Sequence, residues 1–232
     1  LCDTGNLRCV ISSIKALNIN IKGIICDFLS AGAILIPQNS KKSHLIMDIG
    51  AQVTLLSIFE GNKLKFAHAI QIGSEQITKD LSICLKCSMS EAERIKILYG
   101  QLQRFKDNLS EYICVQCHDG QKQIKMSLII SIIESRVTQL FQFSKKYLKF
   151  APCYDEVILT GSGANLKGFE YWVESKLGKP MNQSAENLYQ ELNINSNYIV
   201  AVGQIIYGHQ IGLVHKKRHS ELRQLTQKLF ST

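Results

Sequence analysis

Three segments of the sequence place acidic or small residues where a strand-like run meets a turn. The first ends in Asp48 and Gly50 and returns a hydroxyl group at Thr54. A carboxylate suits Mg²⁺ or its bound waters, and glycine backbone suits close contact with phosphate oxygens. This segment therefore favours a magnesium–phosphate site, although a β-hairpin with a capping aspartate is the simpler interpretation of the segment taken alone.

The other two segments are glycine turns that run into predicted helices. One turn centres on Gly73, and the other follows residues 157–160 and comprises Gly161, Ser162, Gly163 and Ala164. Glycine turns let the backbone approach a flat or anionic ligand, and helix N-termini favour negative charge. The spacing matches neither the dinucleotide-binding fingerprint nor a phosphate loop with its lysine.

Hydrophobic patterns around these turns predict a mixed α/β sheet with helices on its faces. A capping box from Ser90 to Glu93 is expected to begin one helix. We expect strands at 23–26, 43–50, 53–59, 63–72, 110–117, 121–126 and 156–160, and helices at 6–16, 29–35, 77–87, 90–98, 128–147, 166–177 and 198–213.

Composition limits the class of protein without selecting its partner. The 232 residues are 45% hydrophobic and 20% charged, which is typical of a globular chain. The net charge of +8 favours anionic partners such as nucleotides, nucleic acid or acidic lipid. The chain starts at Leu1, which suggests a fragment, and neither a secretory signal nor an apolar stretch of spanning length is apparent.

Two C-x-x-C pairs, at Cys84 and Cys87 and at Cys114 and Cys117, could indicate zinc, and His118 completes a haem-attachment string. Residues 88–113 separate the pairs, more than the common ribbon spacing of about 15 to 20. We expect free cysteines in a reducing cytosol and no metal–cysteine site. No catalytic triad or paired-carboxylate arrangement is apparent, so no catalytic residue is predicted.

Taken in order, the segments resemble the FtsA-like bacterial cell-division proteins of the actin-like ATPase superfamily. The family's Asp-Ile-Gly-Gly-Gly-Thr-Thr loop is matched at 48–54, its Ile-Pro-Ile-Gly-Gly and Ile-Thr-x-Asp run at 70–80, Ala-Glu-x-Ile-Lys…Tyr-Gly at 92–100, Ile-Ile-Glu-x-Arg at 132–136, and Leu-Thr-Gly-Gly-Gly-Ala at 159–164. Ala51, Gln52 and Val53 depart from the family's first loop, since they replace two glycines and a threonine.

The resemblance implies a partial actin-like (ribonuclease H-like) fold with a small inserted subdomain. Residues 1–38 would end the first large subdomain, 39–82 and 151–213 would form the second, 83–150 would be the insertion, and 214–232 a basic amphipathic tail. ATP with Mg²⁺ would be held weakly, by Asp48, Gly50, Thr54, Gly73, Glu93, Lys96, Gly161, Ser162, Gly163 and Ala164. At most a weak ATPase is expected, and no turnover by this chain alone.

The resemblance also implies an adaptor that links the FtsZ polymer to the cytoplasmic face of the cell membrane, with self-association possible and no nucleic-acid partner. The FtsZ tail would bind near Lys122, Lys125, Met126 and Ser127. In the tail, apolar residues at helical spacing follow a basic run, the pattern of an interfacial helix. A helix packed on the body of the protein, or a disordered tail, is the alternative that the same residues allow. Its membrane-binding residues would be Lys216, Lys217, Arg218, Leu222, Leu225, Leu229 and Phe230. The alternatives are another actin-like ATPase, such as a sugar kinase or chaperone, or a non-functional fragment.

Overall fold

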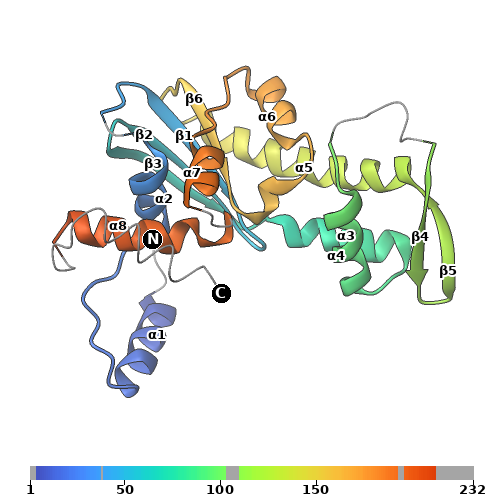
Figure 1. The fold of residues 1–232 in the computed structure, drawn as a ribbon, viewed down its shortest axis with the longest axis horizontal. Coiled ribbons are helices and arrows are strands. Elements are labelled where there is room, and N and C mark those ends of the chain that lie inside the picture. The colour runs from blue at the N-terminus through green and yellow to red at the C-terminus, as the bar shows by residue number, and fades with distance from the viewer. Residues whose placement is uncertain (1–3, 38, 103–109, 193–195, 213–232) are drawn as a thin grey trace.

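The computed structural model describes residues 4–37, 39–102, 110–192 and 196–212. A four-stranded mixed sheet lies at its centre, in the order β3-β2-β1-β6 (Figure 1). Its strands are β1 (Ser43–Ile49), β2 (Thr54–Glu60), β3 (Lys63–Ile70) and β6 (Glu156–Thr160). β1 pairs antiparallel with β2 and parallel with β6. The parallel pairing brings the turns that follow β1 and β6 to the same edge of the sheet.

Helices cover both faces of this sheet, as the alternation of β1 side chains requires. Leu45 and Met47 join a core with α3 (Ser74–Leu85), α5 (Met126–Leu148) and α6 (Phe169–Leu177). Ile46 points to the other face, where it packs with α2 (Asp27–Leu35), α7 (Ser184–Leu192) and α8 (Ile199–Gln210). The result is a sandwich of three layers, helix, sheet and helix.

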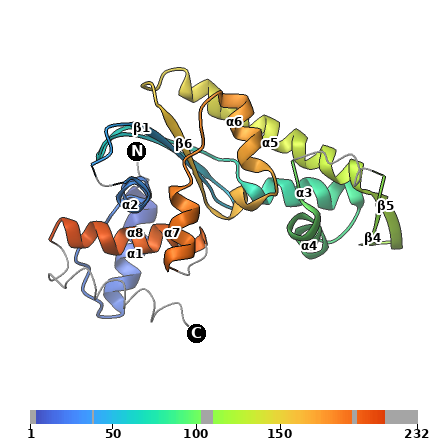
Figure 2. The same cartoon turned by 45° about the horizontal axis from the view of Figure 1, so that its top comes forward.

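A smaller unit extends from one end of the sandwich (Figures 1 and 2). It contains α4 (Met89–Tyr99) and a hairpin of β4 (Tyr112–Cys117) and β5 (Gly120–Lys125). α5 begins directly after β5 and runs for 23 residues, a length of roughly 35 Å. Its buried face therefore contributes both to the hairpin end and to the central sheet.

Most expected elements are confirmed, and three expectations are wrong. Residues 23–26 form no strand, because this segment has no neighbouring strand and Ile24 is exposed. α7 was not expected, since only Ala185 and Leu188 supply its apolar contact with the sheet layer. The hydroxyl that caps α4 belongs to Ser88, not to Ser90, and it accepts from the Glu91 amide.

The two N-terminal helices differ in their contacts with the rest of the structure. α1 (Thr4–Ala16) lies apart from both sheets. α2 packs on α8 in the core that also contains Ile46 of β1. Across the described residues, none of the helices combines the length and hydropathy needed to cross a membrane.

Candidate functional site

A cavity of about 640 Å³ lies where the central sheet meets α4. Two turns and two helices form its walls: the turn after β1, the start of α3, the turn after β6, and α4. Its lining residues are Ala51, Ser74, Glu75, Glu93, Lys96, Ile97, Ser162, Gly163, Asn165 and Leu166. Residues from all the expected nucleotide-binding segments therefore lie around one space.

Glycines are required here because the turns touch one another through backbone. Gly161 has φ +84°, and a Cβ atom on it would collide with Asp48 Oδ1. A Cβ on Gly73 would lie 2.5 Å from the carbonyl oxygens of Gly50 and Ala51, and one on Gly163 would lie 2.5 Å from Ile49 Cγ2. These approaches explain the residue types that the sequence presents at the ends of β1 and β6 and before α3.

The turn after β1 is closed by backbone hydrogen bonds that also anchor α3. The Gly50 amide donates to the Val53 carbonyl at 3.0 Å, and the Ser74 amide donates to the Gly50 carbonyl at 2.9 Å. Ala51 is exposed and lines the cavity. Thr54 is fully buried (0% exposed), and its hydroxyl donates to the Ile72 carbonyl at 2.8 Å. Thr54, expected among the nucleotide-binding residues, therefore uses its hydroxyl within the protein and does not line the cavity.

Glu93 and Lys96 are held together by a buried threonine on the neighbouring helix. The Thr78 hydroxyl donates to Glu93 Oε2 at 2.6 Å, and Lys96 Nζ donates to that hydroxyl at 2.9 Å. Glu93 and Lys96 also form an ion pair at 2.8 Å, with Lys96 only 11% and Glu93 44% exposed. Partial burial raises the pKa of Glu93, but hydrogen bonds from Lys96 and Thr78 outweigh this and lower it.

Asp48 is the titratable group whose environment is least favourable for its charge. Burial, together with the smaller effect of the Asp27 carboxylate, raises the pKa of Asp48 to about 6. Asp27 lies in the first turn of α2, so the second carboxylate that acts on Asp48 belongs to a different element. Carboxylate oxygens are the donors that Mg²⁺ prefers, and a bound cation would relieve their repulsion. The residues present therefore fit a magnesium ion.

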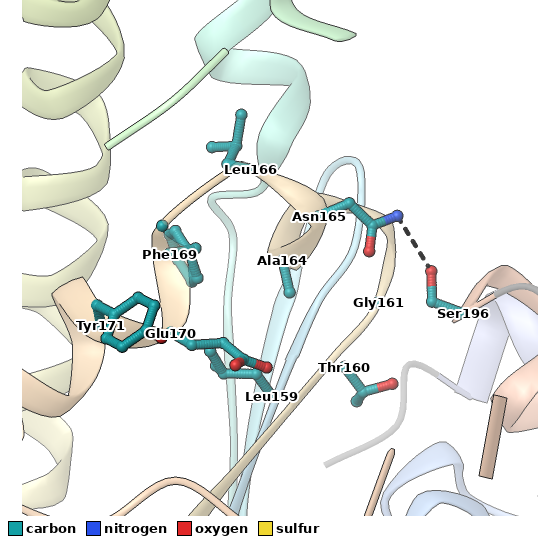
Figure 3. Close-up of a pocket in the computed structure, with 11 residues that line it drawn as sticks. Leu159, Thr160, Gly161, Ala164, Asn165, Leu166, Phe169, Glu170, Tyr171 and Ser196 are labelled. Carbon is teal, nitrogen blue, oxygen red and sulfur yellow. Dashed lines mark hydrogen bonds between the residues drawn. The ribbon is translucent and has the colours of Figure 1, made fainter. Parts of the chain in front are cut away.

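Not every expected residue faces the main cavity. Gly161 and Ala164 line a second pocket of about 310 Å³ at the turn after β6 (Figure 3). Asn165 lines both spaces, and its amide donates to Ser196 Oγ at 3.4 Å. The turn after β6 therefore contributes lining residues to both pockets.

The four residues expected to bind a partner at the end of β5 and the start of α5 differ in exposure. Lys122 and Lys125 are exposed, and Lys122 pairs with Asp119 at 2.6 Å. Met126 is the first residue of α5 and is buried at 5% exposure, so its expected partner contact is wrong. Ser127 is half-buried. The expected membrane-binding residues of the tail, 216–230, lie outside the described residues.

The two C-x-x-C pairs do not converge as four ligands. Along β4 the side chains alternate, so Cys114 is exposed on one face and Cys117 is buried on the other. Cys84 is exposed on α3, and Cys87 is buried after it. Within the part of the chain that the structure describes, no cluster of three or more metal-ligating side chains is present.

Comparison with solved structures defines the class of fold. MreB5 of Spiroplasma citri bound to AMPPNP superposes with a TM-score of 0.61 at 17% identity, covering 80% of this chain and 58% of that one. A PilM–PilN type IV pilus biogenesis complex gives a TM-score of 0.61 at 18% identity, covering 86% of this chain and 56% of its counterpart. The fold is therefore actin-like.

Sequence comparison then identifies the family. Residues 45–203 match the family described as cell division protein FtsA. Cell division protein FtsA of Enterococcus faecalis is 33% identical over 129 residues, covering 53% of this chain and 29% of the relative. FtsA of Buchnera aphidicola subsp. Acyrthosiphon pisum is 24% identical over 234 residues, covering 94% and 54%. The chain belongs to the FtsA family and spans between about a third and about half of these relatives' lengths.

Several residues of the site, Glu75 and Leu166 of the cavity lining among them, carried no recognised role in the sequence. Asp27 precedes Asp48 by a long interval, and Thr78 appeared only as part of a motif. Ile97 and Asn165 line the cavity beside the expected residues. The Ile-Thr-x-Asp motif contains Thr78 and could have drawn attention to it. No local sequence pattern indicates that Asp27 acts on Asp48.

Proposed function

We propose that this chain forms the adenine-nucleotide site of an FtsA-type cell-division adaptor. The observation that carries the proposal is the cavity between α4 and the turn after β6, because Glu93 and Lys96 face Ser162 and Gly163 across it. Lys96 supplies positive charge and Glu93 supplies carboxylate acceptors for ribose hydroxyls. The structurally similar MreB5 was solved with AMPPNP and with ADP, which supports the same class of ligand here.

Each wall of the site has a distinct task in this proposal. The glycine turn after β6 lies against the nucleoside, where backbone can approach a flat ring. The turn at Gly50 and the N-terminus of α3 lie toward the phosphates, and helix N-termini stabilise negative charge. Asp48, with Asp27 near it, would hold Mg²⁺ directly or through water. Magnesium supplies charge neutralisation for phosphate oxygens when it is bound.

A fluorescent ATP analogue titrated in the presence of Mg²⁺ tests the proposal. Ser162 is exposed and lines the cavity, so Ser162→Trp fills the space without disturbing the core. We expect this variant to lose binding by at least about tenfold. Gln121→Trp on the exposed face of the distant hairpin is the matched control and should bind like the unaltered chain. Equal binding by Ser162→Trp would remove this cavity from the proposal.

We also propose that the β4–β5 hairpin receives the tail of FtsZ through Lys122 and Lys125. The support is the exposure of both lysines of β5, of which Lys125 directly precedes α5, and the family's role in cell division. Asp119 already forms an ion pair with Lys122 and so competes with the FtsZ tail for the charge of that lysine. Binding should therefore be weak and should fall with added salt.

An FtsZ tail peptide titrated at low and high salt tests this second proposal. Lys122→Glu with Lys125→Glu should abolish binding, while Lys63→Glu with Lys65→Glu makes the same charge change on the β2–β3 hairpin and should not. A tight, salt-insensitive complex, or equal loss in both double variants, would contradict this assignment.

Residues 214–232 are proposed to bind the anionic cytoplasmic face of the membrane. The support is the basic run followed by leucines at helical spacing. Each cationic residue near an anionic surface contributes ~1 kcal/mol. Sedimentation with anionic and neutral vesicles should pellet the full chain on anionic lipid more than a chain that ends at Val214. Equal pelleting of both chains would exclude the tail.

A further inference from the structure

Cys87 and Cys117 lie opposite one another where the link between α3 and α4 passes the end of β4. They form an isolated antiparallel bridge. The His118 amide donates to the Lys86 carbonyl at 2.9 Å, so the hydrogen bond flanks the cysteine pair and does not join it. In such a non-hydrogen-bonded pair the Cα atoms are about 4.5 Å apart and the side chains lie closest. That separation is within the roughly 4.4 to 6.8 Å that a disulfide spans.

The surroundings of the two thiols fix them in this position. Cys87 is 1% and Cys117 4% exposed, and both are free thiols. Cys117 Sγ donates to the Leu85 carbonyl at 3.2 Å. The Cys87 carbonyl accepts from the Ser82 hydroxyl at 2.7 Å, which holds the link against the end of α3. Burial and the neighbouring Cys117 together raise the pKa of Cys87. Each buried cysteine therefore has the other as its nearest candidate for covalent bonding.

We propose that Cys87 and Cys117 are a modification site at which a small-molecule disulfide, such as glutathione disulfide, forms an intramolecular disulfide bond. One cysteine thiolate attacks a sulfur atom of the oxidant and releases one thiol. The second cysteine thiolate attacks the resulting mixed disulfide and releases the second thiol. The two cysteines lose two electrons and two protons in total, and the oxidant gains both.

The bond would fasten the start of α4 to β4 and close the loop between residues 87 and 117. α4 carries Glu93 and Lys96, so oxidation would also restrict one wall of the cavity. Because burial raises the pKa of Cys87, the reaction is slow at neutral pH and accelerates as the pH rises. The inference rests on the backbone pairing and does not depend on nucleotide binding.

Peptide mapping of the full chain after incubation with glutathione disulfide at about pH 8.5 tests the site. Trypsin cleaves after Lys86, so a bond from Cys87 joins fragment 87–94 to fragment 107–122. A bond from Cys84 would carry the preceding fragment instead. Cys114 shares fragment 107–122 with Cys117, so the Cys114→Ser variant distinguishes the two.

We expect the 87–94 to 107–122 link in the unaltered chain and in Cys114→Ser, and its loss in Cys117→Ser. The oxidised chain should unfold at a temperature higher by about 5 °C, and a thiol reductant should reverse the shift. Retention of the link in Cys117→Ser, or its loss in Cys114→Ser, would overturn the proposal. If Cys117→Ser does not fold, the unaltered chain and Cys114→Ser decide alone, since absence of the link in both also overturns it.

Discussion

Arg136 of α5 and Asp80 of α3 form a bidentate ion pair. Arg136 Nε lies 2.6 Å from Asp80 Oδ2, and Nη2 lies 2.7 Å from Oδ1. Both side chains are about a quarter exposed, at 25% and 27%. The pair joins α3, which begins at the Gly73 turn, to α5, which begins directly after the hairpin. It therefore connects a helix at the cavity to a helix that reaches the smaller unit.

Loss of this pair should destabilise the chain measurably. Arg136→Ala is expected to lower the free energy of unfolding by ~1–2 kcal/mol, because Asp80 keeps a partly buried charge without its partner. Arg136→Lys keeps the charge but cannot form the fork, so its loss should be smaller. Urea denaturation of the three chains measures both. Equal stability of Arg136→Ala and the unaltered chain would contradict the importance of the pair.

Asp48→Asn should stabilise the chain at neutral pH and have little effect in acid. Burial raises the folded pKa of Asp48 to about 6, above its ordinary 3.8. The folded state therefore prefers the protonated form. The stability that this form brings is complete below the ordinary pKa and is lost as the pH rises through about 6. At about pH 7.5 without Mg²⁺, the variant should gain up to ~3 kcal/mol, because each pKa unit is worth ~1.4 kcal/mol.

Denaturation curves at about pH 4 and pH 7.5 measure this difference between Asp48→Asn and the unaltered chain. Added Mg²⁺ should reduce the gain, since only the aspartate binds the cation well. An equal stability difference at both pH values would show that ionisation of Asp48 is not its cause.

Thr78→Val should weaken nucleotide binding although Thr78 does not line the cavity. The valine keeps the shape of the side chain but removes the hydroxyl that bridges Glu93 and Lys96. Both charged groups would then change orientation, and we expect a loss of affinity of about five- to tenfold. Thr78→Ser retains the hydroxyl and should bind like the unaltered chain. Titration with the fluorescent nucleotide distinguishes them, and similar losses in both variants would indicate altered packing instead.

Restoring glycines in the turn after β1 should strengthen nucleotide binding. Ala51 and Gln52 are exposed, and Ala51 lines the cavity. Side chains at these two positions would limit how closely the backbone amides approach phosphate. Ala51→Gly with Gln52→Gly should raise affinity for ATP by about tenfold, with a smaller gain for adenosine, which has no phosphates. Comparable gains for ATP and adenosine would refute contact between this turn and the phosphates.

The sequence by itself determined the elements and the turns of the site. The continuous apolar runs of β1 and β6, and the glycines that follow them, are local properties that can be read from the sequence. The ordered motifs likewise identified the family, because each is read without knowing its neighbours in space. The prediction of a strand at 23–26 was wrong because a strand needs a neighbouring strand to pair with. The residues of the segment do not specify whether such a neighbour exists.

Only the tertiary structure decided which side chains face the cavity. Thr54 turns its hydroxyl into the sheet layer and Met126 enters the core, although both stand in segments with exposed neighbours. The charge of Asp27 acts on Asp48 because α2 packs over the sheet together with α8. Cys87 pairs with Cys117 because the α3–α4 link passes β4. Hydrophobic periodicity specifies which face of an element is buried. It does not specify which distant element covers that face, because sheet register and helix packing set those contacts.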